Sequence, residues 1–313
     1  MNERTQIAIK LIASHFILII GLLLLSLVSI KDDFLLLSIT QTVLIILFFA
    51  GYWEFFGLRF KNIFCLVIEL VILSILIWKV YSGLNSGANM YLVIILSMIQ
   101  TYLLLELTRI LIVINKKNRL NVEIAFPFHQ GDYLITDGGN SRISRLMNYH
   151  FYSPTHKKKG TSLSMLYATD IVKIGKDKMN FLPITNEAYP IFNEKIYSPI
   201  DGLIVKVVNN IPDNKTFAGN YPYNTGNTVV IQKDNLFLLM GHMKQGSIRV
   251  KEGDSVKQND PIGAAGNSGW TERPHLHMQL IQSDSSNYWF GKGVCMLYRD
   301  KNLYKNRLIK LSN

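Results

Sequence analysis

The sequence predicts a chain in two parts, an all-α membrane region followed by an all-β domain. Residues 1–115 are dominated by Leu, Ile, Val and Phe, whereas the remainder is polar and rich in turn residues. The second part contains closely spaced short runs of β-branched and aromatic residues and no long amphipathic helix, which is typical of a β-sandwich or barrel. A chain of 313 residues has room for about two units of roughly 100–200 residues each. We therefore expect membrane helices in 1–115, a basic linker in 116–121 and a globular domain in 122–313.

Four apolar stretches account for the membrane prediction. Each approaches the ~20 residues that a helix needs to cross ~30 Å of hydrocarbon. Their very short connections argue against a soluble all-α domain, and the first lacks the small-residue cleavage site of a removable signal peptide. Glu106 and Arg109 lie one turn apart in the last stretch and can neutralise each other, which favours an anchor over a transporter or channel. The stretches lie at about 7–30, 34–53, 63–82 and 90–115.

The distribution of basic residues predicts on which side of the membrane the globular domain lies. With four spans, the N-terminus, the second loop and the globular domain share one side, and the positive-inside rule assigns that side to the cytoplasm. If the third stretch, which has Glu69 near its middle, did not cross, the domain would lie on the outer side. The basic residues on the domain's side are Arg4, Lys10, Arg59, Lys61, Lys116, Lys117 and Arg119, against Lys31 and Lys79 on the other.

The net charge of +11 comes mainly from the second part and the linker. Such a charge suits an anionic surface, either the lipid headgroups of a bilayer or an acidic cell-wall polymer. No nucleic-acid-binding motif accompanies it, so nucleic acid is not an expected partner. The sequence makes no prediction of the oligomeric state.

The globular part is expected to be built from short strands separated by turns. Turn signals stand at Asp201-Gly202, Asp234-Asn235 and Gly253-Asp254. The runs that predict strands are 122–128, 131–140 (a strand and then a turn), 167–174, 202–208, 228–232, 236–240 and 276–282.

The most informative motif is the histidine pair His275-Leu276-His277, which follows a glycine-rich turn. Two histidines at this spacing on a strand point to the same face, so one ring can bind a metal while the other exchanges a proton beside it. Neutral imidazole is a common ligand of zinc. His242 ends an apolar run, and Asp170 and His150 stand in short motifs upstream. Together these residues predict a zinc hydrolase site.

The other cysteine and histidine residues are not expected to contribute to this site. Cys65 lies inside a predicted span and Cys295 near the C-terminus, which argues against a disulfide between them and against a thiolate zinc site. His15 lies in the first predicted span and His129 in the strand after the linker. Neither has other metal ligands nearby in the sequence, so we expect both to be structural.

Residues 196–282 resemble a lysostaphin/LytM-type zinc endopeptidase domain. The segments 197–202 and 226–231 resemble its first two strands, and 241–256 resembles its "H-L-x-x-x-x-V-x-x-G-x-x-V" segment. The glycine-rich turn that leads to the histidine pair completes the series, and the core motifs span 148–282. The resemblance implies a lysostaphin-type, sandwich-like or barrel-like β fold.

The resemblance also implies a ligand set for Zn²⁺. In this family the ion is held by a histidine and an aspartate of a first motif and by the second histidine of H-x-H, which correspond here to His150, Asp170 and His277. The chain departs from the usual H-x-x-x-D spacing, because His150 and Asp170 are twenty residues apart. It is similar instead to members with "N-x-H" followed later by "Y-A-x-D". His156 is the alternative first ligand, but it adjoins a lysine run that favours a solvated role.

By the same resemblance, His275 would act as the general base and return the proton to the leaving amine. His242 would hydrogen-bond the tetrahedral oxyanion or assist proton transfer. The expected protein is a membrane-anchored zinc metalloendopeptidase that hydrolyses peptide cross-links of bacterial peptidoglycan. One alternative, which the charge distribution favours, is a peptidase that processes a small peptide such as a bacteriocin or signal precursor. Another is a catalytically inactive relative that binds the cell wall.

Overall fold

The structure, a computed structural model of the 313-residue chain, describes residues 121–140, 148, 150, 163–175, 183–219 and 224–311. All of them belong to the second of the chain's two compact units, Leu111–Asn313. The four predicted spans lie outside the described residues, as do His15, Cys65 and His156. Within the described ranges, no helix has the length and apolar character needed to cross a membrane.

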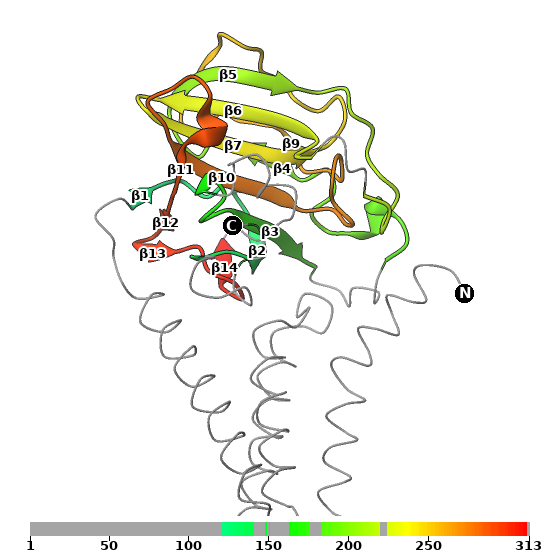
Figure 1. Cartoon of the computed structure of the whole chain (residues 1–313). Helices are drawn as coiled ribbons and strands as arrows, with labels where there is room; N and C mark the ends of the chain where they lie inside the picture. The colour runs from blue at the N-terminus through cyan, green and yellow to red at the C-terminus, as the bar shows by residue number, and fades with distance from the viewer. Residues whose placement is uncertain are drawn as a thin grey trace, which may run out of the picture. The chain divides into compact units, whose positions relative to one another are not determined.

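The domain is all-β, as predicted, and its centre is one antiparallel sheet of nine strands (Figure 1). The strands follow the order β14-β2-β3-β10-β7-β6-β5-β8. The ninth strand, β11, pairs with the end of β10 that β3 leaves unpaired, on the same edge as β3. Their bounds are β2 (Gly131–Asp137), β3 (Thr169–Ile174), β5 (Gly202–Val208), β6 (Asn227–Lys233), β7 (Leu236–Met243), β8 (Ser255–Val256), β10 (Leu276–Gln282), β11 (Lys292–Val294) and β14 (Leu308–Leu311).

Two small sheets and two short 3-10 helices complete the described part. One sheet joins β1 (Val122–Glu123), β12 (Met296–Tyr298) and β13 (Lys301–Asn302), and the other joins β4 (Lys195–Tyr197) and β9 (Pro261–Ala264). The helices are η4 (Asn186–Ala188) and η6 (Tyr288–Phe290). Because β1 pairs with β12, the start of the domain is held against its C-terminal region.

Most of the predicted strands are confirmed. The predictions for 202–208 and 276–282 match β5 and β10 residue for residue, and those for 228–232 and 236–240 lie inside β6 and β7. The prediction for 131–140 gives β2, which ends at Asp137, and that for 167–174 gives β3, which begins at Thr169. The strands that the sequence did not predict, β4, β8, β9 and β11 to β14, are only two to four residues long, too short for alternation to be recognisable.

The prediction of a strand over 122–128 is wrong beyond Glu123. The amide of Ile124 donates to the carbonyl of Leu297, but the next amide, of Ala125, donates to the carbonyl of Pro199, so no single partner strand can form a ladder. The segment nevertheless packs into the core. His129 consequently lies in the loop before β2 rather than in a strand, where its ring stacks on Tyr197 with centroids 3.5 Å apart.

The two faces of the main sheet carry different sets of side chains. One face bears the main hydrophobic core, which includes Ile171 of β3, Leu238 of β7 and Met278 of β10. The opposite face bears a smaller apolar cluster of Val230, Phe237, Leu239 and Ile281. Residues two apart on a strand share a face, so His277 and Gln279 lie in one row with Ile281. The row places polar side chains directly beside the apolar cluster.

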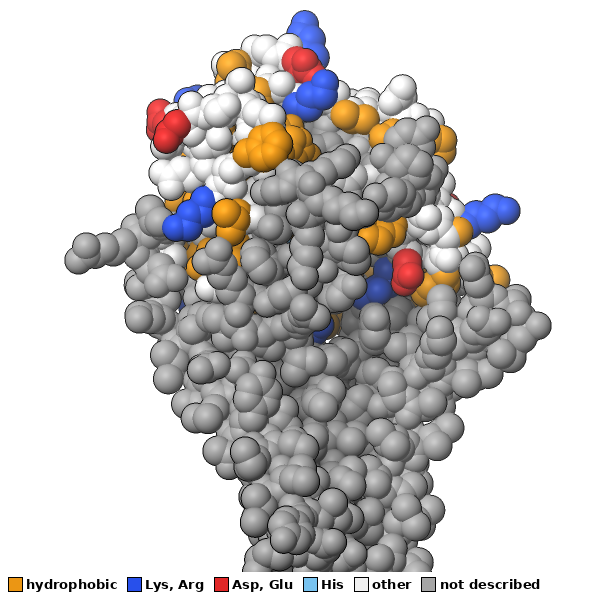
Figure 2. Space-filling view, viewed as in Figure 1, with side chains coloured by type: hydrophobic (Ala, Val, Ile, Leu, Met, Phe, Trp, Pro, Cys, Tyr) orange, Lys and Arg blue, Asp and Glu red, His pale blue; other side chains and the backbone are white. Residues whose placement is uncertain are grey.

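Charged side chains are scattered over the face of the domain that Figure 2 shows. Among the described residues on that face, Lys and Arg side chains stand singly or in small groups between neutral, acidic and hydrophobic ones. The net charge of +11 is therefore not concentrated in one continuous basic patch on the described part of this face.

Leu238→Ala should destabilise the protein by about 2–5 kcal/mol, because a fully buried side chain of the central strand β7 is replaced by a cavity. Urea unfolding of the full-length chain would measure the loss. The matched control is Leu203→Ala on β5, where the side chain is 44% exposed and the cost should stay below about 1 kcal/mol. Equal losses in the two variants would contradict this description of the core.

Candidate metal centre

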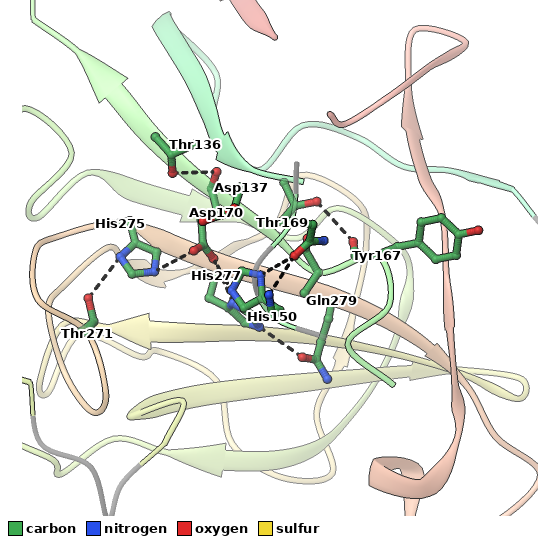
Figure 3. Close-up of polar contacts among 12 residues, drawn as sticks. Thr136, Asp137, His150, Tyr167, Thr169, Asp170, Thr271, His275, His277 and Gln279 are labelled. Carbon is green, nitrogen blue, oxygen red and sulfur yellow. Dashed lines mark hydrogen bonds and ion pairs between the residues drawn. The ribbon is translucent and has the colours of Figure 1, made fainter. Parts of the chain in front are cut away.

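The site is built on the pairing of β3 with β10. In this antiparallel ladder Asp170 lies directly opposite His277, so both side chains project from the same face. The Nδ1 atom of His277 lies 2.9 Å from Oδ1 of Asp170 (Figure 3). Only one nitrogen of His277 faces the carboxylate, since Nε2 contacts Oε1 of Gln279 at 3.1 Å.

His150 approaches the same carboxylate oxygen from outside the sheet. Its Nε2 atom lies 3.3 Å from Oδ1 of Asp170, and its Nδ1 atom lies 2.9 Å from Oδ1 of Asn148. One donor atom from each of His150, Asp170 and His277 lies within 4.8 Å of the other two. The structure thus brings the three predicted ligands together.

The two predicted catalytic histidines lie beside this group. Nε2 of His275 is 3.6 Å from Oδ2 of Asp170, on the side of the carboxylate away from His150. The ring of His242 lies 4.7 Å from that of His275 and 5.7 Å from that of His277, measured between centroids. All five predicted site residues therefore surround one point near the start of β10.

His242 reaches the site through an irregularity of β7. Alternation with Leu238 and Met240 would direct its side chain into the main core. Its φ of 57° breaks the alternation, and the pairing of β6 with β7 shifts register between Asn227 and Val229. Met243 returns to the core one residue later. Such a left-handed residue is strained and is characteristic of functional sites.

The backbone fixes the tautomers of His242 and His275. Nδ1 of His242 donates to the carbonyl oxygen of Ser268 at 2.8 Å, and Nδ1 of His275 donates to that of Arg273 at 2.9 Å. A carbonyl can only accept, so in each neutral ring Nε2 carries the lone pair. Burial lowers the pKa of His275, and it lowers the pKa of His242 further together with the charges of His275 and His277. Both rings are therefore neutral at pH 7 and can accept a proton at Nε2.

Asp170 and His150 lie close together and are only slightly exposed, so each affects the ionisation of the other. Burial opposes ionisation of Asp170, but the charges of His150 and His275 outweigh it and hold the pKa of this carboxyl well below its usual range. Burial also opposes protonation of His150, yet the charge of Asp170 prevails and raises the pKa of that imidazole. Each group therefore favours the charged form of the other.

The donor set fits zinc. Two imidazole nitrogens and one carboxylate oxygen are the ligands of a common class of catalytic zinc site, in which a further position is left for water or substrate. Within the described ranges, Cys295 is a free, buried thiol, and burial raises its pKa to about 12.

Polar residues that the sequence did not single out hold the glycine-rich turn. Oδ1 of Asp213 accepts from the amide of Asn267 at 2.7 Å, and the side-chain amide of Asn214 donates to the carbonyl of Gly269 at 2.6 Å. Gly269 has a φ of 84°, a left-handed conformation that favours glycine. These contacts join segments more than 50 residues apart, so no local signal could reveal them.

Residues 188–288 match the model of the peptidase family M23. The match includes His242, His275 and His277, whereas His150 and Asp170 precede it. A segment of 97 residues, 31% of this chain, is 35% identical to the peptidoglycan DD-endopeptidase ShyA of Vibrio cholerae and covers 19% of that protein. A segment of 67 residues, 20% of this chain, is 43% identical to endolysin 2638A of Staphylococcus phage 2638A and covers 14% of it.

The chain is also similar to part of a solved structure. The catalytic domain of lysostaphin from Staphylococcus simulans is 24% identical, with a TM-score of 0.26, over 39% of this chain and 70% of that domain's chain. The match to ShyA spans about a fifth of that relative's length. The family model and the curated relatives together support the assignment of this segment to the peptidase family M23.

His277→Ala should abolish retention of zinc by the full-length protein, because it removes one of three ligands and leaves Asp170 without its closest partner. Zinc content after dialysis, measured by atomic emission, would show it, with circular dichroism to verify folding. His129→Ala is the control, since His129 stacks on Tyr197 and should leave the zinc content unchanged. Retention of stoichiometric zinc by folded His277→Ala would refute the ligand assignment.

Proposed function

We propose that this chain is a zinc-dependent metalloendopeptidase that hydrolyses peptide cross-links of bacterial peptidoglycan, and that residues 1–115 anchor it in a membrane. The observation that carries the proposal is the convergence of His150, Asp170 and His277 within 4.8 Å, with two neutral imidazoles beside them. The family model supports peptide hydrolysis, and the similarity to ShyA, a peptidoglycan DD-endopeptidase, supports the substrate class.

A zinc ion, when bound, would polarise the scissile carbonyl and acidify a water molecule. The residues of the chain would supply the rest of the chemistry. His150, Asp170 and His277 would hold the ion through Nε2, a carboxylate oxygen and Nδ1, the atoms that face one another in the site. Their burial would keep bulk water away from the reacting groups, which strengthens each electrostatic interaction there.

His275 is the better placed of the two candidates for general base. A base is most effective when its pKa is near the working pH, and the pKa of His275 is lowered less than that of His242. The lone pair of Nε2 would take a proton from the water, while the Arg273 carbonyl keeps the ring oriented through Nδ1. The same nitrogen would then return the proton to the leaving amine.

His242 would first accept a proton, and only then could it donate a hydrogen bond to the tetrahedral oxygen. Its neutral ring offers only a lone pair at Nε2, so it becomes a hydrogen-bond donor to the tetrahedral oxygen only once it has taken up a proton. The two roles that the sequence left open for this residue are therefore consecutive states of one ring. Its close approach to His275 would allow the proton to be shared between them.

A second candidate function is the processing of a small peptide, such as a bacteriocin or signal precursor, at the cytoplasmic side. The observation in its favour is the excess of Lys and Arg in the N-terminus, the second loop and the linker. The chemistry would be the same, and only the accessible substrate would differ. A catalytically inactive, wall-binding relative is less favoured, because it would not need two further neutral imidazoles at the metal position.

His275→Ala should retain zinc but lose about 10²–10⁴-fold in the rate of peptide hydrolysis, the usual contribution of a general base. The assay is incubation of the full-length zinc-loaded protein with purified peptidoglycan, followed by mass spectrometry of the released fragments. His129→Ala should cleave like the parent protein. Full activity in His275→Ala would refute the role of His275 as general base. If the zinc-loaded parent protein did not cleave peptidoglycan, the second candidate function, processing of a small peptide, would be favoured.

Protease added to intact cells should digest the C-terminal domain if it acts on peptidoglycan, because that substrate lies outside the membrane. Immunoblotting with an epitope tag after Asn313 would follow the digestion. Permeabilised cells and a cytoplasmic marker protein are the controls. Protection in intact cells with digestion after permeabilisation would contradict the peptidoglycan proposal and agree with the positive-inside distribution.

A further inference from the structure

The two imidazole ligands present different nitrogens to Asp170. His150 directs Nε2 toward the carboxylate, at 3.3 Å, whereas His277 directs Nδ1 toward it, at 2.9 Å. The nitrogen left over in each ring contacts the oxygen of a side-chain amide. Nδ1 of His150 lies 2.9 Å from Oδ1 of Asn148. Nε2 of His277 lies 3.1 Å from Oε1 of Gln279, a contact that Figure 3 shows.

The orientation of the Asn148 amide is determined by the backbone around it. Its Nδ2 donates to the carbonyl oxygens of Ala168 at 2.8 Å and of Gly139 at 2.9 Å. Its Oδ1 must then face His150, where it accepts from both the main-chain amide and Nδ1 of that residue. Because an amide oxygen only accepts, Nδ1 of His150 carries the hydrogen and the lone pair is at Nε2.

Gln279 is the counterpart on the sheet. It is fully buried, and its strand position lies between His277 and Ile281 of the small apolar cluster. Its Oε1 contacts Nε2 of His277, while its Nε2 has no hydrogen-bond partner among the described residues. A buried amide with an unsatisfied donor is unfavourable, and an apolar side chain of similar length would remove that cost. Among the described residues, the side chain of Gln279 therefore makes one hydrogen bond, to the proposed ligand His277.

We propose that Asn148 and Gln279 are positioning residues that hold the two ligand histidines in opposite tautomers. Asn148 keeps the hydrogen of His150 on Nδ1, and Gln279 keeps the hydrogen of His277 on Nε2, so that both lone pairs face the same point beside Asp170. Hydrogen bonds of this kind, from a ligand histidine to an acceptor behind it, commonly change metal affinity by 10–100-fold. The inference rests on the proposed zinc site and assigns two residues that support it.

Gln279 allows the sharper test, because its replacement removes no donated hydrogen bond from the described fold. In Gln279→Met the zinc dissociation constant of the full-length protein should rise about 10–100-fold. The midpoint of unfolding of the zinc-free protein should stay the same or rise. Gln279→Glu restores an acceptor and should bind zinc within about tenfold of the parent.

The matched control is Gln232→Met on β6, where the side-chain amide donates to the carbonyl of Asp234 instead of contacting a ligand. It should leave the dissociation constant of zinc unchanged. The hydrogen on Nε2 of His277 can be followed in the zinc-loaded protein by ¹H–¹⁵N correlations of the imidazoles. Its ¹H resonance should lie downfield in the parent, where Gln279 accepts the hydrogen, and should shift upfield in Gln279→Met, where that hydrogen bond is lost.

Zinc binding by Gln279→Met equal to that of the parent would overturn the inference. So would weaker binding accompanied by an equal loss of stability in the zinc-free protein and no recovery in Gln279→Glu, because that result describes a packing role. If the parent protein bound no zinc, the proposed function would fail. The inference, which rests on that site, would then fail with it, whereas tight zinc binding by both the parent and Gln279→Met would overturn the inference alone.

Discussion

The register of β3 against β10 is the constraint on which the rest of the site depends. It sets Asp170 opposite His277, so that a carboxylate and an imidazole from distant parts of the sequence meet at 2.9 Å. A slip of one residue would direct Asp170 into the main core and bring Ile171 to the site, because strand side chains alternate between faces. β10 is held against such a slip by β7 along one edge and by β3 and β11 along the other. The geometry of the candidate site is thus a consequence of sheet pairing.

The buried carboxylate is stable only because its surroundings are organised around it. A charge removed from water is costly unless other groups compensate it, and imidazole nitrogens of His150, His275 and His277 lie 3.3, 3.6 and 2.9 Å from the carboxylate of Asp170. The backbone in turn directs the lone pairs of His242 and His275 inward, through the carbonyls of Ser268 and Arg273. Several neutral nitrogen lone pairs around one anion form a site whose chemistry favours a cation. Burial, tautomer and charge therefore support the same functional conclusion.

The site is assembled from two separate stretches of the chain. The segment matched by the M23 model provides His242, His275 and His277, whereas His150 and Asp170 lie before it. The pairing of β3 with β10 joins the two stretches, and β2 and β14 continue the sheet beyond β3. The residues before the matched segment are for this reason part of the same sheet and of the same site.

The sequence by itself predicted the all-β class of the domain and most of its longer strands, and it named five site residues that the structure places close together. The strand predictions succeeded because alternation over five or more residues is a local property. The strand predicted over 122–128 failed because its backbone bonds to two different segments, which no local pattern records.

Only the tertiary structure decided how these residues work together. Sequence spacing could not show that His150 meets an aspartate twenty residues away, since the sequence between them has no regular periodicity. The left-handed φ of His242 arises from a shift in the pairing of β6 with β7, and the contacts of Asn148 and Gln279 depend on which nitrogen of each ring faces inward. The local sequence pattern predicts which residue types form the site and where the longer strands lie. Pairing register and buried hydrogen bonds select the orientation of each side chain, because they depend on partners that are distant in the sequence.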